Sequence, residues 1–322
     1  MRKHHVVAVI LIVATGVFAA ACGGSSDDTS STGSDGDVKP TIAVVSISGS
    51  DYFTSYNKGF EKAADKLGLD VKVQNATAYD PNAVAQTINA AVATKPDYLI
   101  APAIDSAALS QPLRQASERG IKVITYDTQV DDPSFVLSYV NADYHEYGLL
   151  AGKELGRLVG GTGKVLLDAI VPGNADLQSL QDGFAEGLPE GVTELPVQYG
   201  QGDNSKASAI IRATLSREPD LAGVSAASAF GGEGTIAGLS EAGKTGEVKA
   251  VLLSATPFAI AALKDDEAQV VIAEPLQIIA ERAVKAAYDD ANGKAVPEEI
   301  RLPLCTITVK TIDDPKNAKC IQ

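Results

Sequence analysis

Short apolar runs alternate with amphipathic segments along most of the chain. The run TIAVVS at residues 41–46 is apolar almost throughout, as expected for a strand buried on both faces. Phe53, Tyr56 and Phe60 then recur at helical spacing, and Gly68 ends the pattern. A strand followed directly by a helix is the repeating unit of a parallel α/β sheet.

The same alternation continues nearly to the C-terminus. Further strands are expected at 71–74, 98–101, 121–125, 135–139, 164–169, 195–199, 223–227, 248–253, 269–273 and 304–309. Helices are expected at 80–94, 107–119, 144–159, 177–187, 205–217, 233–242, 258–265 and 278–291. One continuous sheet would have to hold more strands than open sheets usually do. We therefore expect an α/β protein with two doubly wound parallel-sheet domains.

The first 22 residues have the pattern of an export signal. Arg2 and Lys3 precede the apolar run 6–20, which is shorter than the roughly 20 residues of a membrane-spanning helix. The following AAAC resembles a lipobox, in which Cys22 is lipidated and becomes the mature N-terminus. Ala19 stands where such motifs usually have Leu, so secretion without an anchor stays open. Residues 23–39 are nearly devoid of apolar side chains, and we expect a flexible linker there.

Composition narrows the classes of function. The chain has 27 Lys and Arg residues against 41 Asp and Glu residues, a formal net charge of −14, with no basic run for nucleic acid to contact. Export places the cysteines in an oxidising compartment, so Cys305 and Cys320 are predicted to form a disulfide worth about 3 kcal/mol. Two free thiols are the alternative.

Signatures of catalysis are missing from the sequence. It contains neither G-x-S-x-G nor H-E-x-x-H, and His145 is the single histidine after the signal. The stretch GGTGK at 160–164 does not complete a phosphate loop. We expect no enzyme activity, no cofactor and no metal site.

Ligands of doubly wound sheets bind at the carboxyl ends of the strands. The polar and aromatic residues expected there include hydroxyl, amide and carboxyl groups but few nucleophile–base pairs. This set favours holding a small polar molecule over cleaving it. The predicted ligand-binding residues are Ser48, Asp51, Tyr52, Phe53, Asp105, Asp127, Thr128, Tyr144, Asn174, Gln178, Ser228, Phe230, Ser254 and Glu274.

Several stretches, in their order and spacing, resemble the ribose- and galactose-type periplasmic sugar-binding proteins. They are TIAVVSISGSDYFTSYNKGFEKAADKLG, IAPAIDSAAL, GIKVITYD and IAEPLQIIAERAVKAA, and the resemblance spans about residues 41–309. It implies the type I periplasmic binding protein fold, in which three crossovers form a hinge between two lobes. The implied lobes are 40–141 plus 275–302 and 142–274 plus 303–322.

The resemblance also assigns roles to single residues. Tyr52 and Phe53 match paired aromatics that stack on a sugar ring, although one of the two packing in the core is an alternative. Asp127 matches an acid that accepts hydrogen bonds from ligand hydroxyls. Ser228 and Glu274 fall where the family often has Asn and Gln.

Three positions depart from the family pattern. Leu180 stands where a binding arginine is usual, Ser254 replaces an acid, and Thr128 replaces an arginine common in ribose binders. The predicted site therefore contains acids but no basic residue. We expect a neutral or cationic ligand rather than a carboxylated one. An uncharged polyol, an atypical sugar, a nucleoside-like molecule and a furanone signal all fit.

The function implied by the resemblance is solute capture by hinge closure. A lipid-anchored, extracytoplasmic, monomeric binding protein would deliver its ligand to the membrane permease of an ABC transporter for sugar transport. A sensor for chemotaxis or signalling with the same fold is the main alternative. An enzyme and a structural lipoprotein whose cleft has lost its function are further alternatives.

Overall fold

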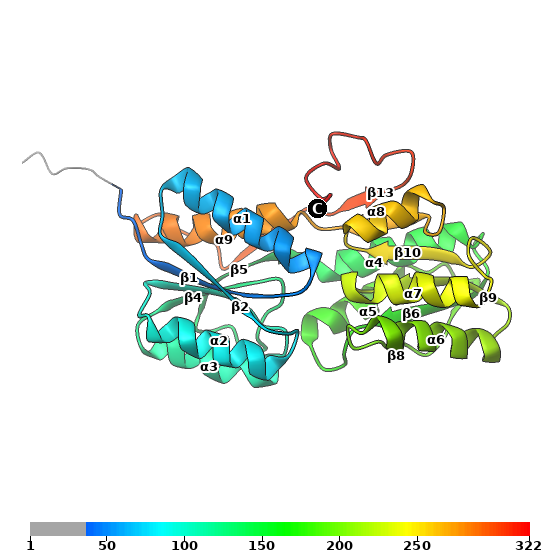
Figure 1. The fold of residues 1–322 in the computed structure, drawn as a ribbon, viewed down its shortest axis with the longest axis horizontal. Helices are drawn as coiled ribbons and strands as arrows, with labels where there is room; N and C mark the ends of the chain where they lie inside the picture. Colours follow the sequence, from blue (N-terminus) through cyan, green and yellow to red (C-terminus); the bar gives the residue numbers. More distant parts are fainter. Residues whose placement is uncertain (1–36) are drawn as a thin grey trace, which may run out of the picture. The chain divides into compact units, whose positions relative to one another are not determined.

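The computed structural model describes residues 37–322 of the chain. The predicted signal peptide, the lipidation site Cys22 and nearly all of the predicted linker lie outside the described residues. Within residues 37–322 the strands form two sheets, each flanked by helices on both faces (Figure 1). The predicted fold class, two doubly wound α/β sheets, is confirmed.

The first sheet has the strand order β12-β5-β4-β3-β1-β2, and all of its pairings are parallel. Helices α1 and α9 cover one face, and α2 and α3 cover the other (Figure 1). The strands are β1 (Ile42–Ile47), β2 (Val71–Ala76), β3 (Tyr98–Pro102), β4 (Lys122–Tyr126), β5 (Val136–Ala142) and β12 (Glu299–Leu302). The helices are α1 (Asp51–Leu67), α2 (Pro81–Ala93), α3 (Ser106–Glu118) and α9 (Leu276–Ala291).

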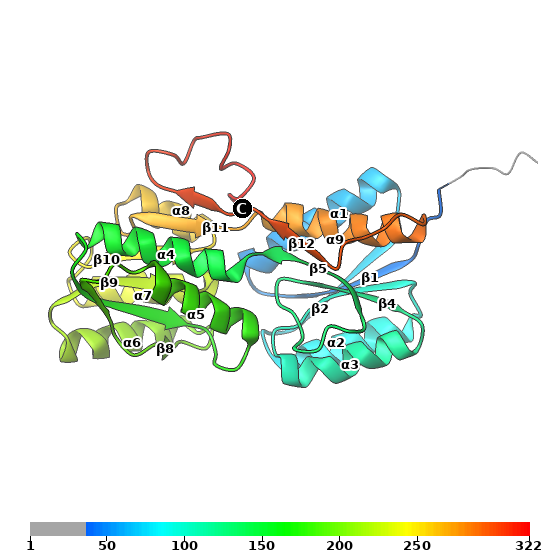
Figure 2. The same ribbon diagram turned by 180° about the vertical axis from the view of Figure 1, so that it is seen from behind.

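The second sheet has the order β13-β11-β10-β9-β6-β7, with β8 also paired to β6. Only β13 runs antiparallel to its neighbour among the described strands of this sheet. The strands are β6 (Gly163–Ala169), β7 (Val192–Glu194), β8 (Gln198–Tyr199), β9 (Leu221–Ala226), β10 (Lys249–Leu253), β11 (Val270–Ala273) and β13 (Cys305–Ile307). The helices are α4 (Tyr144–Leu158), α5 (Ala175–Gly187), α6 (Asn204–Arg217), α7 (Ala229–Glu241) and α8 (Pro257–Lys264). Figure 2 shows α4 and α5 on the face opposite α6 and α7.

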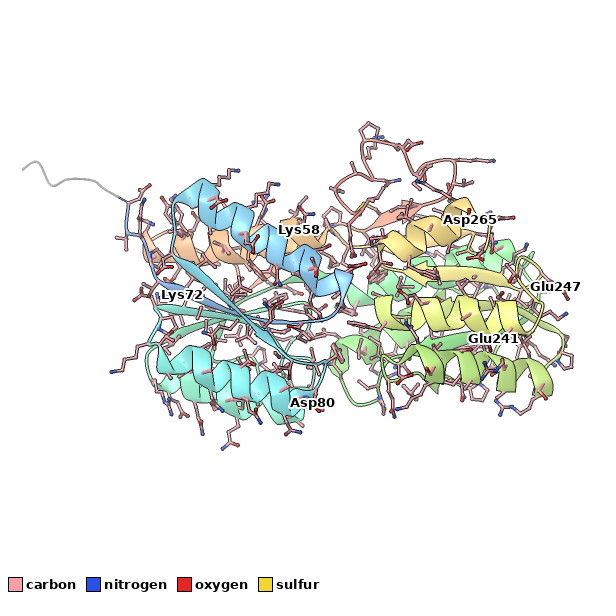
Figure 3. All side chains as sticks on the ribbon, viewed as in Figure 1. Lys58, Lys72, Asp80, Glu241, Glu247 and Asp265 are labelled. Atoms are coloured by element: carbon pink, nitrogen blue, oxygen red, sulfur yellow. A yellow bond between two sulfur atoms is a disulfide. The ribbon has the colours of Figure 1, made fainter. Side chains whose placement is uncertain are left out.

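The chain passes between the two sheets three times. It leaves the first sheet after β5, returns to it after β11 by way of α9, and leaves it again after β12. Charged side chains such as Lys58, Asp80 and Glu241 are exposed on the outer helices and their ends (Figure 3). The sheets themselves are buried, as the strand pattern β1 IAVVSI illustrates.

Glycines bring α4 and α5 into close contact. A Cβ atom on Gly148 would lie 1.9 Å from the carbonyl oxygen of Leu180, and one on Gly183 would lie 2.1 Å from that of His145. No larger residue fits at these two positions without a backbone shift. At these two glycines the backbones of α4 and α5 touch directly. This contact therefore fixes the position of α5, which carries Leu180.

Three elements differ from the sequence-based expectation. The strand expected at 195–199 is two short strands, β7 and β8, separated by residues 195–197 with Pro196. Helix α7 begins earlier than expected, because Ser228 caps it and a glycine-rich first turn hides its apolar periodicity. Strand β12 was not expected at all. Its residues alternate between exposed and half-buried, so they form no apolar run.

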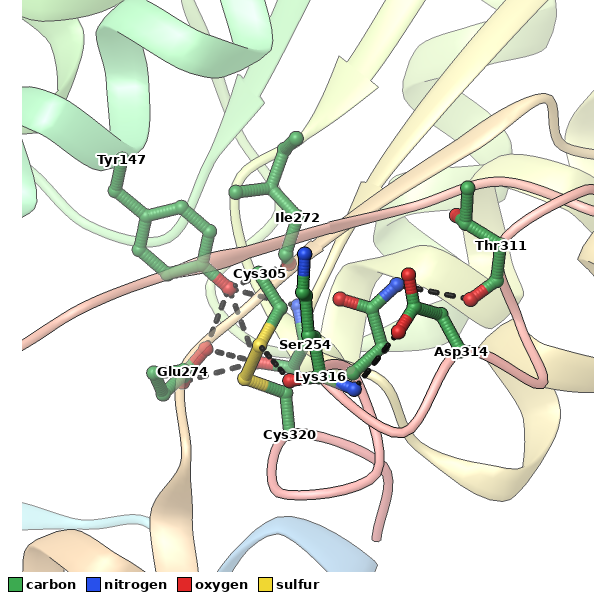
Figure 4. The surroundings of a disulfide bond; sticks show 10 residues. Tyr147, Ser254, Ile272, Glu274, Cys305, Thr311, Asp314, Lys316 and Cys320 are labelled. Carbon is green, nitrogen blue, oxygen red and sulfur yellow. Dashed lines mark hydrogen bonds between the residues drawn. A yellow bond between two sulfur atoms is a disulfide. The ribbon is translucent and has the colours of Figure 1, made fainter.

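Cys305 and Cys320 form the predicted disulfide, with their sulfur atoms 2.02 Å apart and their Cα atoms 6.3 Å apart. It ties the segment after β13 to the second sheet, close to Tyr147, Ser254 and Glu274 (Figure 4). Within residues 37–322 no helix combines the length and the apolar character needed to cross a membrane. The same residues hold no cluster of three or more His, Cys, Asp or Glu side chains suited to a metal ion.

Candidate functional site

A cavity lies where the carboxyl ends of strands from both sheets meet. Its volume is about 40 Å³, because side chains from the two sides lie close together across it. The space is smaller than the roughly 300–1,000 Å³ of most small-molecule sites, so a ligand would need the two sides to move apart. Of the residues predicted from the sequence, its lining includes Tyr52, Asp127, Thr128, Tyr144, Ser228, Phe230, Ser254 and Glu274.

Asp127 follows β4 directly and is buried in this cavity. Its backbone has a positive φ of 65°, an uncommon conformation for a residue other than glycine. The hydroxyls of Tyr52 and Tyr144 donate hydrogen bonds to its Oδ1 atom over 2.7 and 2.9 Å. The hydroxyl of Tyr139 donates to its backbone oxygen over 2.7 Å. These contacts hold the Asp127 carboxylate in one orientation.

Glu274 directly follows β11 of the second sheet, and its side chain lines the cavity. The Tyr147 hydroxyl donates to its Oε2 atom over 2.6 Å, and the Ser254 hydroxyl donates to Oε1 over 3.0 Å. The backbone N–H of Ser254 in turn donates to the Tyr147 oxygen over 2.8 Å. Figure 4 shows these three side chains converging. Glu274 is therefore fixed by a small network of hydroxyl groups.

Burial dominates the electrostatics of both acids. It raises the pKa of Asp127 to about 7, although the hydrogen bonds from Tyr52 and Tyr144 act in the opposite direction. Burial also raises the pKa of Glu274, and the hydrogen bond from Tyr147 opposes this shift. Among the residues that line the cavity, all of them in the described part of the chain, none is Lys, Arg or His. Within residues 37–322, the two carboxyl groups thus have no cationic partner in the cavity.

Aromatic rings supply much of the remaining lining. Tyr52, Tyr79, Tyr144, Tyr147 and Phe230 all contribute to the cavity wall. The ring of Phe230, from the first turn of α7, lies 6.2 Å from that of Tyr52 and 5.3 Å from that of Tyr79, measured between centroids. Phe230 belongs to a helix of the second sheet, whereas the other two follow strands of the first. The aromatic contact therefore spans both sides of the cavity.

A further contact between the two sides involves Asp176, near the start of α5. Its Oδ2 atom accepts a hydrogen bond from the backbone N–H of Gln129 over 2.8 Å. It also lies 3.0 Å from the Tyr139 hydroxyl, whose single proton is shared between this carboxyl group and the backbone oxygen of Asp127. Burial raises the pKa of Asp176, and the bond from Gln129 opposes that rise. Tyr139 thus links Asp176 to the backbone of Asp127.

Six of the residues predicted from the sequence lie outside this cavity. Phe53 is buried in the core of the first sheet, Ser48 is exposed, and Asp51 lines a separate open depression at the start of α1. Asp105 and Asn174 instead cap α3 and α5 by accepting backbone N–H hydrogen bonds. Gln178 is exposed and donates to Asp182.

Other lining residues were not predicted. They are Tyr79, Tyr147, Ile170, Leu177, Ala227, Ala229 and Leu253, together with Leu180, which was noted only as a departure from the family pattern. Tyr147 follows Tyr144 by one helical turn, so the i,i+3 spacing contained a usable signal. The apolar members carry no such signal, because their sequence pattern is that of ordinary core residues.

Comparison with known proteins identifies the family. The sequence matches the periplasmic binding protein domain over residues 42–295. It is 26% identical over 262 residues to the ribose import binding protein of Bacillus subtilis (strain 168). This match covers 80% of this chain and 84% of that protein. The fold and the site define an extracytoplasmic solute-binding protein. The chain belongs to the periplasmic binding protein family, whose members are solute-binding proteins rather than enzymes.

Solved structures agree with this assignment. The solute-binding protein of an ABC transporter from Agrobacterium vitis, bound with α-D-tagatopyranose, superposes with a TM-score of 0.85 at 30% identity, covering 88% of this chain and 99% of that one. A solute-binding protein from Actinobacillus succinogenes 130z with bound D-allose has a TM-score of 0.79 at 22% identity and covers 84% of this chain and 98% of its own. The predicted resemblance to ribose- and galactose-type binding proteins is confirmed.

Proposed function

We propose that the chain captures a small polyhydroxy molecule, a sugar or polyol, and delivers it to the membrane permease of an ABC transporter. One observation carries the proposal: the cavity at the strand ends of both sheets combines two carboxyl groups with several aromatic rings. Carboxylates accept hydrogen bonds from ligand hydroxyls, and ring faces pack on the C–H face of a sugar. The ribose import binding protein and the tagatopyranose-bound relative support the same ligand class.

The lining argues against a carboxylated ligand. Asp127 and Glu274 would repel the carboxylate of such a ligand. None of the described lining residues is a cation that could pair with that carboxylate. Thr128, Ser228 and Ser254 add hydroxyl groups suited to a neutral partner. These features favour a ligand rich in hydroxyl groups and free of negative charge.

In this proposal the binding unit consists of two lobes, 40–141 plus 275–302 and 142–274 plus 303–322, and the ligand lies between them. Closure would bring together pairs such as Tyr144 with Asp127 and Phe230 with Tyr52. Asp176 and Gln129 form a pair of the same kind. Because these contacts involve no ligand atom, closure would be favoured by the protein as well as by the ligand. The open form would admit the ligand, and the closed form would present the outer faces of both lobes to the permease.

The N-terminal segment would keep the binding unit at the membrane. In this proposal Cys22 carries the lipid anchor, and residues 23–39 form a linker spanning roughly 20–24 Å. The protein acts as a monomer, without catalysis, cofactor or nucleic acid. Mass spectrometry of the mature N-terminus tests the anchor directly, since a diacylated Cys22 is the expected species.

The ligand proposal is tested by calorimetry on residues 23–322 with D-ribose, D-allose, D-tagatose, D-arabinose and myo-inositol, beside D-galacturonate and succinate. Saturable binding of at least one neutral compound is expected, with loss of at least tenfold in affinity in Asp127→Ala. Glu61→Gln is the matched control, because Glu61 is an exposed acid on α1 outside the cavity. Tight binding of galacturonate or succinate alone would overturn the proposed ligand class.

A further inference from the structure

The described residues that line the cavity contribute two buried carboxyl groups and no positive charge. The side chains of Asp127 and Glu274 both line it, and these residues are only 6% and 5% exposed. All of their hydrogen-bond partners in residues 37–322 are neutral hydroxyl groups, from Tyr52, Tyr144, Tyr147 and Ser254. A buried carboxylate is stable when it is paired with a cation and otherwise tends to take up a proton. A ligand that brought a positive charge would supply the missing partner.

One carboxylate oxygen is available for such a partner. Both tyrosine hydroxyls that bind Asp127 do so at Oδ1. No side chain in the described part of the chain donates a hydrogen bond to Oδ2. On Glu274, by contrast, both oxygens already accept hydroxyl hydrogen bonds. Asp127 would therefore make the direct contact, and Glu274, which lines the same cavity, would add the attraction of its charge.

The aromatic lining suits a cation as well. Tyr52, Tyr79, Tyr144, Tyr147 and Phe230 surround the same space as the two acids. The face of an aromatic ring attracts an ammonium group, by about 0.5–1 kcal/mol at exposed sites and more where water is excluded. Ring faces would also pack against the C–H surface of a sugar. The rings alone are thus compatible with both kinds of ligand, and the unpaired charge of the acids decides between them.

We propose that the preferred ligand is a polyhydroxy molecule with an alkylammonium group, such as an amino sugar or an aminopolyol, and that Asp127 binds this group directly while the charge of Glu274 strengthens the attraction. The inference rests on the proposed function and narrows its ligand class. The competing arrangement is a neutral sugar bound to protonated carboxyl groups. The two arrangements differ in what happens when one hydroxyl of the ligand is replaced by an ammonium group.

Matched pairs of compounds provide the test. Calorimetry at constant pH and ionic strength compares D-glucose with D-glucosamine, D-galactose with D-galactosamine, D-mannose with D-mannosamine, and D-glucitol with 1-amino-1-deoxy-D-glucitol. Within each pair, one hydroxyl is replaced by an amine. In at least one pair the amine is expected to bind at least tenfold more tightly, a difference of about 1.4 kcal/mol.

Variants then assign the preference to the two acids. Glu274→Gln and Asp127→Asn keep side-chain size and remove one charge each, so each is expected to lower the amine-to-hydroxyl affinity ratio at least fivefold. Glu61→Gln removes an exposed negative charge outside the cavity, and the ratio should stay within twofold. Leu180→Arg introduces a cation from a 2% exposed lining residue, and it should abolish amine binding. If that variant does not fold, Glu274→Gln and Asp127→Asn still decide whether the two acids cause the preference for the amine.

The inference is overturned if no amine binds more tightly than its hydroxyl partner, or if Glu274→Gln and Asp127→Asn leave the ratio unchanged. These failures are separable from failure of the proposed function. Binding of D-glucose, D-galactose, D-mannose or D-glucitol without an amine preference would leave the proposed function standing. If none of the eight compounds binds, the inference falls, and the proposed function is decided by the neutral sugars and the acids of the earlier panel.

Discussion

Asp127 and Ser254 occupy the same place in the two sheets. Asp127 directly follows β4, which lies between β5 and β3, and Ser254 directly follows β10, which lies between β11 and β9. Both have left-handed backbone conformations, with φ of 65° and 69°, and both line the cavity. Each half of the site therefore uses the same strained turn to direct a polar side chain inward. One half places a carboxyl group there and the other a hydroxyl group.

The strain at Ser254 can be measured by comparing two substitutions. Ser254→Ala and Ser254→Gly both remove the hydrogen bond to Glu274, but only glycine adopts a positive φ without a steric penalty. Ser254→Gly is therefore expected to be more stable than Ser254→Ala by about 1 kcal/mol. Urea denaturation of both variants gives the difference directly. Equal stabilities would mean that the turn carries no strain.

Replacing Gly148 by alanine should damage both stability and binding. The new Cβ atom would lie 1.9 Å from the Leu180 carbonyl oxygen, so α4 and α5 would have to separate. We expect a loss of about 2–4 kcal/mol in the free energy of unfolding and weaker ligand binding, because Leu180 lines the cavity.

Gly232 of α7 is the matched control for this substitution. A Cβ atom there would approach its nearest neighbour, Leu252, at an ordinary 3.8 Å, so Gly232→Ala should stabilise the helix by about 0.5–1 kcal/mol. Thermal unfolding of the two variants should therefore shift in opposite directions. A stable Gly148→Ala protein with unchanged affinity would contradict the assigned role of the helix contact.

Asp168 makes the stability of the protein depend on pH. It lies at the end of β6, is 2% exposed, and burial raises its pKa to about 7. Since the folded state then holds a proton that the unfolded state releases above about pH 4, this residue lowers the free energy of unfolding as pH rises from about 4 to 7. Asp168→Asn should therefore stabilise the protein at pH 8, by on the order of 2–4 kcal/mol, and have little effect near pH 4.

Denaturation curves at several pH values test this prediction. The variant and the parent should coincide at low pH and diverge through neutrality. The polar group that opposes the pKa rise of Asp168 is the backbone N–H of Gly200, and this N–H already donates to the carbonyl oxygen of Ala169, so the amide should lose little contact made by the acid. Destabilisation of Asp168→Asn at pH 8 would show that the carboxylate has a partner of its own.

Asp176 and Tyr139 are expected to act together in holding the two sides of the cavity in contact. Asp176→Ala removes the acceptor for both Tyr139 and the Gln129 backbone, and Tyr139→Phe removes one of the two donors. Each should increase the radius of gyration of the ligand-free protein in small-angle X-ray scattering. The double variant should differ from Asp176→Ala by less than Tyr139→Phe differs from the parent, because the shared hydrogen bond is already lost. Fully additive changes would exclude a direct coupling.

The disulfide should stabilise the protein against unfolding. Cys305 and Cys320 are separated by 15 positions, a loop for which about 3 kcal/mol is expected. Replacing both by alanine, or reducing the parent protein, should lower the free energy of unfolding by about 3 kcal/mol, which is measured as a lower denaturation midpoint. Reductant should have no further effect on the double variant, which serves as its own control. An unchanged midpoint after confirmed reduction would contradict the prediction.

Much of the fold follows from the sequence because the strands are buried on both faces. A fully apolar run such as β1 is visible in any window, whereas half-buried β12 is not. The residue after β4 could likewise be placed, since the run KVITY ends at Asp127. The direction of adjacent side chains is harder to derive. Tyr52 lines the cavity and Phe53 lies in the core, because neighbouring residues on a helix point about 100° apart.

The unpredicted parts of the site have a physical explanation. Asp and Asn after a strand are suited both to bind a ligand and to cap the next helix, and Asp105 and Asn174 cap helices. Ile170 and Leu177 line the cavity through the relative placement of distant elements, which no local pattern encodes. The sequence therefore predicts the polar binding groups Asp127 and Glu274 better than it predicts the apolar residues that line the cavity around them.

The contact between α4 and α5 has a consequence for how this protein can change over evolutionary time. Gly148 touches the main chain at position 180, whereas the side chain of that residue lines the cavity. The contact with Gly148 therefore involves only backbone atoms at position 180. A lineage could exchange this one side chain and acquire a new selectivity while inheriting an unaltered helix pair.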